Sequence, residues 1–294
     1  MSVHVKGEYD HAHYYVPHGS HWPIVGSVGL FTTLGAAALW LEDVSLGPWL
    51  FPIGLLIILT MMFGWFGTVI RESEAGAYNQ QVDTSFRWGM TWFIFSEVMF
   101  FAAFFGALFY ARTFALPWLG GEGKNLFTNL LLWNNFESAW PTNGPAAVGG
   151  AFKAMEALGV PALNTAILLT SGLTVTIAHW GLKNNQRGKL KLFLLFTVLL
   201  GFSFVTLQAM EYHHAYTAQN LTLGTGIYGS TFFMLTGFHG LHVTIGAIML
   251  CVMLGRSLKG HFTPDHHFAF EAVSWYWHFV DVVWLGLYIF VYWL

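Results

Sequence analysis

Residues 92–101 read WFIFSEVMFF, an apolar run with one carboxylic acid, Glu97, in its middle. In hydrocarbon such a group costs several kcal/mol unless it is neutral, paired or hydrated, so the surrounding solvent decides how this stretch is interpreted. Of the 294 residues, 55% are hydrophobic and only 9% are charged, whereas about a quarter are charged in soluble domains. The composition therefore indicates a membrane protein.

Apolar segments recur along the whole chain at the length of about 20 residues that a transmembrane helix needs. A membrane barrel would instead show short segments of alternating hydrophobicity, and the sequence lacks them. We therefore predict an all-α integral membrane fold with seven transmembrane helices. Their expected ranges are 24–41, 48–70, 88–111, 161–182, 190–210, 227–255 and 268–293.

The segments outside these ranges are polar or rich in glycine. Residues 1–23 form a polar, histidine-rich amino-terminal segment without the pattern of a cleavable signal, and residues 24–294 are expected to form one seven-helix domain. The first span would then act as its own insertion signal. Glycine and proline in the loop 112–160 oppose long regular structure, and we expect one short helix near 150–158.

The distribution of lysine and arginine predicts the orientation, because the cytoplasmic side retains positive charge. In the seven-span model, nine of the twelve basic residues lie in connections on one side, and the other three lie in a loop long enough to cross regardless of charge. The amino terminus is therefore expected inside and the carboxyl terminus outside. The nine are Lys6, Arg71, Arg87, Lys183, Arg187, Lys189, Lys191, Arg256 and Lys259, and the three are Arg112, Lys124 and Lys153.

Charge and cysteine content exclude several function classes. A net charge of −3 gives no basic surface for nucleic acid. The single cysteine, Cys251, leaves no disulfide framework, no haem-attachment motif and no thiolate pair for a metal. The cysteine content therefore predicts no thiolate-bound metal site in this chain.

Polar side chains inside the spans are the candidates for function. Counted at 1.5 Å per residue from the cytoplasmic ends, Glu97 lies about 13 Å deep, and four other polar groups lie about 15–26 Å deep. Two i,i+3 pairs among these groups place their members on one helix face each. We therefore predict a polar layer shared by the third, sixth and seventh spans. Besides Glu97, it contains His239, His242, His278 and Asp281.

Three interpretations of this layer remain open from the residues alone. The groups could form hydrogen bonds between closely packed helices. The three histidines could bind haem or a metal. Glu97 could belong to a proton or ion path, although the broken helices or inverted repeat of a transporter are not evident. The amino-terminal residues His11, His13 and His18 are either ordinary solvated groups or a proton-collecting buffer.

Several motifs carry a family resemblance over nearly the whole chain. They are HAHYYVPHGSHWPIVG, VIRESEAG, RWGMTWFIFSEVMFF, VPALNTAILLTSG, YGSTFFMLTGFHGLHVTIG and HHFAFEAVSWYWHFVDVVWLGLYIFVYWL. Together they resemble subunit III of the haem–copper cytochrome c oxidases. The loop 117–160 is longer than in the mitochondrial subunit and is similar to bacterial forms, so the resemblance is to the bacterial type.

The resemblance implies a fold and partners. A two-helix bundle of the first two spans and a five-helix bundle of the others would enclose a V-shaped cleft filled with phospholipid. The chain would hold no haem or copper, would pack on catalytic subunit I, and would share a bacterial inner-membrane complex with subunit II and other oxidase or supercomplex subunits. Glu97 matches the family's carbodiimide-reactive carboxyl, and Arg71, Glu72 and Arg256 match positions associated with lipid head groups.

The implied function is that of an accessory subunit. The oxidase would pass electrons from cytochrome c to oxygen and pump protons, while this chain supports proton uptake, stable turnover and oxygen access. One alternative is subunit III of a quinol oxidase, which typically lacks the first two spans; another is a structural or assembly protein. We expect Glu97 to be neutral at pH 7 and structural, because ionisation among phenylalanines is costly.

Overall fold

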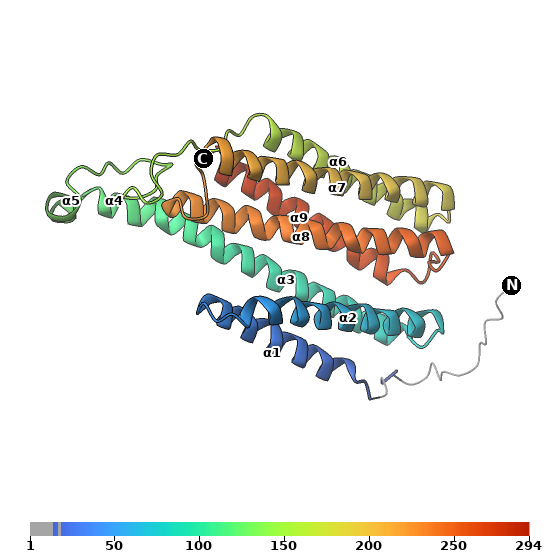
Figure 1. Cartoon of the computed structure of the whole chain (residues 1–294). Coiled ribbons are helices and arrows are strands. Elements are labelled where there is room, and N and C mark those ends of the chain that lie inside the picture. The colour runs from blue at the N-terminus through green and yellow to red at the C-terminus, as the bar shows by residue number, and fades with distance from the viewer. Residues whose placement is uncertain (1–13, 17–18, 294) are drawn as a thin grey trace. The chain divides into compact units, whose positions relative to one another are not determined.

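The computed structural model describes residues 14–16 and 19–293. Within these residues every regular element is a helix (Figure 1), as predicted from the sequence. The elements are α1 (Trp22–Leu41), α2 (Gly47–Glu74), α3 (Gln80–Tyr110), the π-helix η1 (Ala111–Ala115), α4 (Leu116–Leu119), α5 (Leu126–Leu132), α6 (Val160–Lys183), α7 (Arg187–Ala218), α8 (Gly226–Lys259), α9 (Phe268–Leu287) and the π-helix η2 (Tyr288–Trp293).

Six helices in the described part of the chain are long and apolar enough to cross a membrane. They are α1, α2, the continuous helix from α3 through α4, α6, α7 and α8. The chain is thus a multi-pass membrane protein. The predicted seventh span corresponds to α9 and η2, and α9 contains the polar residues Glu271, His278 and Asp281.

The chain divides into two compact units, with the boundary inside α3 after Trp88. In the first unit, α1 and α2 form a helical hairpin (Figure 1). Glycine permits its close packing, because a Cβ atom at Gly54 would collide with the backbone of Thr33. Farther along the hairpin, the indole Nε1 of Trp22 donates a hydrogen bond of 3.4 Å to Oγ1 of Thr68.

The second unit contains the rest of α3 and the helices α6 to α9. Helix α6 packs against α7 and α9, and α8 packs against α7 and α9. Two fully buried tryptophans fasten α9 to α6. The indole of Trp277 donates to Ser171 and that of Trp284 donates to Thr165, each at 2.9 Å. Because their only polar donors are satisfied, these indoles fill the core without a desolvation cost.

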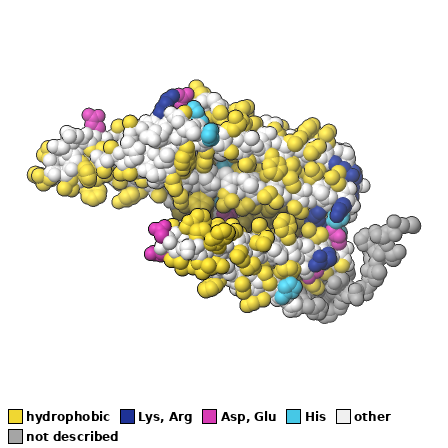
Figure 2. Space-filling view, viewed as in Figure 1, with side chains coloured by type: hydrophobic (Ala, Val, Ile, Leu, Met, Phe, Trp, Pro, Cys, Tyr) yellow, Lys and Arg dark blue, Asp and Glu magenta, His cyan; other side chains and the backbone are white. Residues whose placement is uncertain are grey.

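Apolar side chains cover much of the outer surface. Phe31 is 81% exposed and Phe63 is 73% exposed, and both lie in the middle of long helices. Figure 2 shows hydrophobic side chains over the visible face and charged side chains mainly toward the ends of the helices. Apolar areas this large are unfavourable in water and favourable in lipid. This surface agrees with the membrane assignment.

The expectation of a short helix near 150–158 was wrong. Residues 150–158 form no helix. Gly149 and Gly150 have positive φ angles, and in the irregular segment that follows, Lys153 N donates a hydrogen bond of 2.9 Å to Gln219 O at the end of α7. The short helices of this loop are α4 and α5. The helices α3, α7 and α8 are longer than the apolar ranges within them, because a helix can continue where its side chains become polar.

Candidate functional site

The central polar contact joins α3 to α8. Nε2 of His242 lies 2.8 Å from Oε2 of Glu97, and the other ring nitrogen, Nδ1, lies 2.6 Å from the carbonyl oxygen of Phe238. A carbonyl oxygen can only accept, so Nδ1 carries a hydrogen. The local helical geometry of α8 therefore fixes which tautomer His242 presents to Glu97.

This tautomer limits the Glu97–His242 pair to two protonation states. With its hydrogen on Nδ1, a neutral His242 has a lone pair on Nε2, and only a protonated Glu97 can donate to it. Alternatively, a protonated His242 donates to the Glu97 carboxylate. In both forms one proton lies in the hydrogen bond and the pair has no net charge, which suits an environment of low dielectric constant.

Aromatic side chains enclose the pair. The rings of Phe101 and Phe100 lie 5.0 and 5.9 Å from the imidazole of His242, and Tyr276 of α9 stacks against it at 6.4 Å. The side chains of His242 and Glu97 are only 12% and 21% exposed. The enclosure limits water, so a change that left one partner unpaired would strand a polar group.

The neighbouring histidine of α8, His239, is fully buried and joins α8 to α9. Its Nε2 donates to the carbonyl oxygen of Val280 at 3.1 Å, and its ring packs against Phe204 and Trp284. The hydrogen on Nε2 leaves that nitrogen without a lone pair. His239 thus forms a hydrogen bond between helices through the atom that a haem would need.

His278 and Asp281 of α9 face α6. Nε2 of His278 donates to Thr176 Oγ1 at 3.2 Å, since that hydroxyl already donates to the carbonyl oxygen of Gly172. The carboxyl of Asp281 lies against Gly172, where a Cβ atom would be 2.7 Å from Oδ2. The structure therefore brings Glu97 and His242 together, whereas the other members of the expected layer make separate contacts to α9 or α6.

Sequence reasoning missed a buried carboxyl of α7, Glu211. It is 3% exposed, and its Oε2 accepts hydrogen bonds from Gln208 at 3.0 Å and from the hydroxyl of Tyr292 at 3.2 Å. The predicted apolar range ended at residue 210, just before this group. The spacing of Gln208 and Glu211, three residues apart, is the signal that could have revealed it.

The chain is similar to known proteins over nearly its whole length. A model of the family described as cytochrome c oxidase subunit III matches residues 11–294. The chain belongs to the cytochrome c oxidase subunit III family. Proteins named cytochrome c oxidase subunit 3 from Coturnix japonica and Struthio camelus are each 42% identical to it over 281 residues, and the one from Carassius auratus is 41% identical; each match covers 95% of this chain and 96% of the relative.

The positions that the sequence predicts for lipid head groups in this subunit III chain differ in access. Arg71, at the end of α2, is exposed and donates to Thr68 Oγ1 at 3.0 Å. Glu72 accepts a hydrogen bond of 2.8 Å from Tyr78. Arg256 is 8% exposed, and its guanidinium lies 4.6 Å from the centre of the Phe262 ring. The proton-collecting candidates His11, His13 and His18 lie outside the described residues.

Proposed function

We propose that this chain is a non-redox accessory subunit of an aerobic haem–copper cytochrome c oxidase that pumps protons. It packs on catalytic subunit I, in a complex with subunit II and other oxidase or supercomplex subunits. The family match over residues 11–294 supports this role. The presence of both α1 and α2 supports a cytochrome c oxidase over the quinol oxidase alternative, whose subunit III typically lacks the first two spans.

The observation that carries the non-redox role is the use of the intramembrane histidines. The Nε2 atoms of His239 and His278 donate to Val280 O and Thr176 Oγ1, and both ring nitrogens of His242 are engaged. In all three histidines Nε2 is already committed to a hydrogen bond and cannot bind haem iron. Their arrangement supports a structural role, with the haem and copper of the oxidase held by partner subunits.

The proposed topology has seven spans in a bacterial inner membrane, with α9 and η2 as the seventh span. The amino terminus lies inside and the carboxyl terminus outside. The bias in lysine and arginine supports this orientation, and the burial of Trp277 and Trp284 against α6 supports a place for α9 within the bundle.

Phospholipid binding is proposed at the end of α2. The exposed guanidinium of Arg71 supports it, because paired N–H donors match a phosphate group. Buried Arg256 contributes packing through Phe262, and its role toward lipid stays a prediction. The lipid would support oxygen access and stable turnover of the oxidase.

Proton collection is proposed for the amino-terminal histidines, whose imidazoles titrate near neutral pH. Replacing His11, His13 and His18 with alanine should then slow oxygen consumption most at high pH, where proton supply limits turnover. An unchanged pH–rate curve would assign these residues to the ordinary surface.

Purification of the intact complex tests the proposed function. A tagged chain should copurify with subunits that show haem spectra and oxidise cytochrome c. A strain without this chain should retain those spectra but lose activity faster during turnover. Loss of the haem spectrum from an otherwise assembled complex, or copurification with an enzyme that oxidises only quinol, would contradict the proposal.

A further inference from the structure

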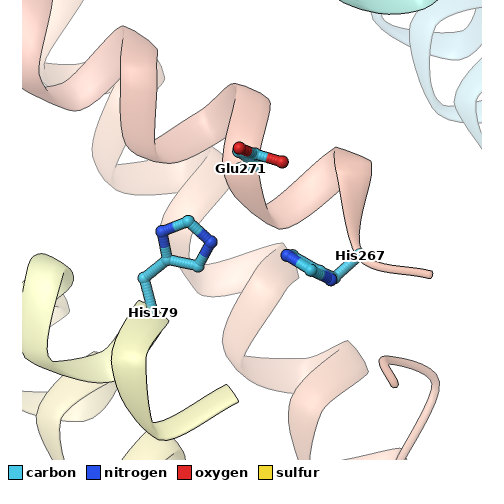
Figure 3. Close-up of side chains that lie close together, drawn as sticks. All are labelled: His179, His267 and Glu271. Atoms are coloured by element: carbon cyan, nitrogen blue, oxygen red, sulfur yellow. The ribbon is translucent and has the colours of Figure 1, made fainter. Parts of the chain in front are cut away.

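Three potential metal ligands meet where the end of α6 approaches the start of α9 (Figure 3). His179 belongs to the last turns of α6, His267 directly precedes α9, and Glu271 belongs to the first turn of α9. One ligand atom from each side chain lies within 4.8 Å of the other two. None of these residues belongs to the Glu97–His242 pair.

The two imidazoles in this cluster have unused nitrogen atoms. The Nε2 atoms of His179 and His267 are both buried, and neither has a hydrogen-bond partner. Buried polar atoms without a partner are uncommon, because each costs about 1–3 kcal/mol. These two atoms leave a pair of neighbouring imidazole nitrogens to which one ligand could bind.

The hydrogen bonding of His267 shows which atom it offers. Its Nδ1 lies 3.1 Å from the carbonyl oxygen of Thr263 and donates to it. The Nε2 atom of the neutral ring then has a lone pair directed into the cluster. Metal-binding histidines usually donate their other ring N–H to a carbonyl or carboxylate oxygen, as His267 does to Thr263.

The donor set identifies the class of ion. Two imidazoles and one carboxylate suit Zn²⁺, which accepts nitrogen and oxygen ligands with tetrahedral geometry and can take water as the fourth ligand. In that geometry the ligand atoms are about 3.4 Å apart. The observed separations, up to 4.8 Å, therefore require only a small rotation of the side chains. The Glu271 carboxylate also supplies negative charge to the ion.

We propose that His179, His267 and Glu271 bind one Zn²⁺ ion, which fastens the end of α6 to the start of α9. The sequence predicts no metal site from the absence of a thiolate pair and from the family resemblance, whereas this cluster uses imidazoles that are 88 residues apart in sequence and meet only in the fold. The proposed ion is zinc, and we still expect the chain to bind no haem, copper or iron. It is also independent of the role assigned to Glu97.

Zinc binding by the full-length chain in its native complex tests the proposal. The starting protein carries alanine at His11, His13 and His18, so that the amino-terminal imidazoles do not compete for the metal. After dialysis against buffered Zn²⁺, mass spectrometry of the metal should give one more Zn²⁺ per complex than in the additional His267→Ala variant. Glu271→Gln should weaken this binding at least about tenfold. His266→Ala alters the neighbouring exposed histidine and should have no effect.

X-ray absorption at the zinc edge supplies the second measurement. We expect two imidazole ligands and one carboxylate in the starting protein. Equal zinc binding in the starting protein and the His267→Ala variant would overturn the proposal, as would a bound ion without imidazole ligands. Glu271→Gln preserves the side-chain shape. If His267→Ala does not assemble, unchanged zinc affinity in Glu271→Gln overturns the proposal alone.

Discussion

At the scale of single residues, the hydrogen bond from His242 Nδ1 to Phe238 O controls the chemistry of Glu97. It leaves Nε2 of His242 to share one proton with the carboxyl, so the pair stays uncharged in either form. The sequence predicted that Glu97 needed a way to be neutral or paired. It did not reveal the partner, because Glu97 and His242 are 145 positions apart. Their side chains come into contact only when α3 and α8 lie side by side in the folded chain.

The pair should show strong coupling in a double-mutant cycle. Glu97→Ala and His242→Ala each strand a polar group among aromatic rings, and the double variant removes both. We expect a coupling free energy of about 0.5–3 kcal/mol between the two sites. Denaturant unfolding of the chain in detergent measures it. Additive effects of the two substitutions would argue that the hydrogen bond contributes nothing to stability.

Arg71 should retain phospholipid in the purified complex. Its exposed guanidinium can bind a phosphate through two donors, which alanine lacks and which lysine cannot reproduce in the same geometry. Lipid mass spectrometry should find less tightly bound phospholipid in Arg71→Ala than in the unaltered protein. Exposed Lys259 offers a control, since Lys259→Ala should leave lipid retention unchanged. Equal retention in all three proteins would contradict the proposed role of Arg71.

At the scale of elements, the existence of long helices could be predicted, because apolar length is a property of the chain alone. Their ends could not, since α7 continues through Glu211 and His213 to Ala218 by packing against neighbouring helices. The same limit hid the zinc-site candidates. His179 lies in a predicted span and His267 at a span end, and only the packing of α6 against α9 brings them together.

Close packing of α1 against α2 should depend on one glycine. Gly54→Ala places a methyl group against the backbone of Thr33 and should reduce the free energy of unfolding of the hairpin by about 1–3 kcal/mol. Gly35→Ala is the matched control. It meets open space within α1 and should stabilise the helix by up to about 1 kcal/mol. Thermal unfolding or proteolysis in detergent should separate the two variants, and equal behaviour would reject the packing argument.

At the scale of the whole molecule, the exposed apolar surface and the basic residues define how the chain sits in a membrane. Phe31 and Phe63 are suited to contact lipid tails, while Lys and Arg concentrate in connections assigned to one side. The family relation places this arrangement in an oxidase complex, where the proposed role is support of the catalytic subunits. Loss of any one polar group should then affect stability before it affects chemistry.

Reporter fusions test the seven-span topology. Fusions after Lys6, Lys189 and Leu294 should report inside, inside and outside, because the first two positions lie in basic connections and the last follows the seventh span. An inside location for Leu294 would mean that α9 and η2 do not cross the membrane. Such a result would reject the seven-span arrangement while leaving the six other helices as assigned.

Proton pumping by Glu97→Gln is the most direct test of the structural role of the intramembrane polar groups. Glutamine has nearly the same shape, and its amide can donate to Nε2 of His242, but it cannot release a proton at neutral pH. In reconstituted vesicles, oxygen consumption and the number of protons pumped per electron should both stay within about twofold of the unaltered oxidase, or about 0.4 kcal/mol. Abolished pumping in an intact complex would make Glu97 a proton carrier and would contradict the structural account.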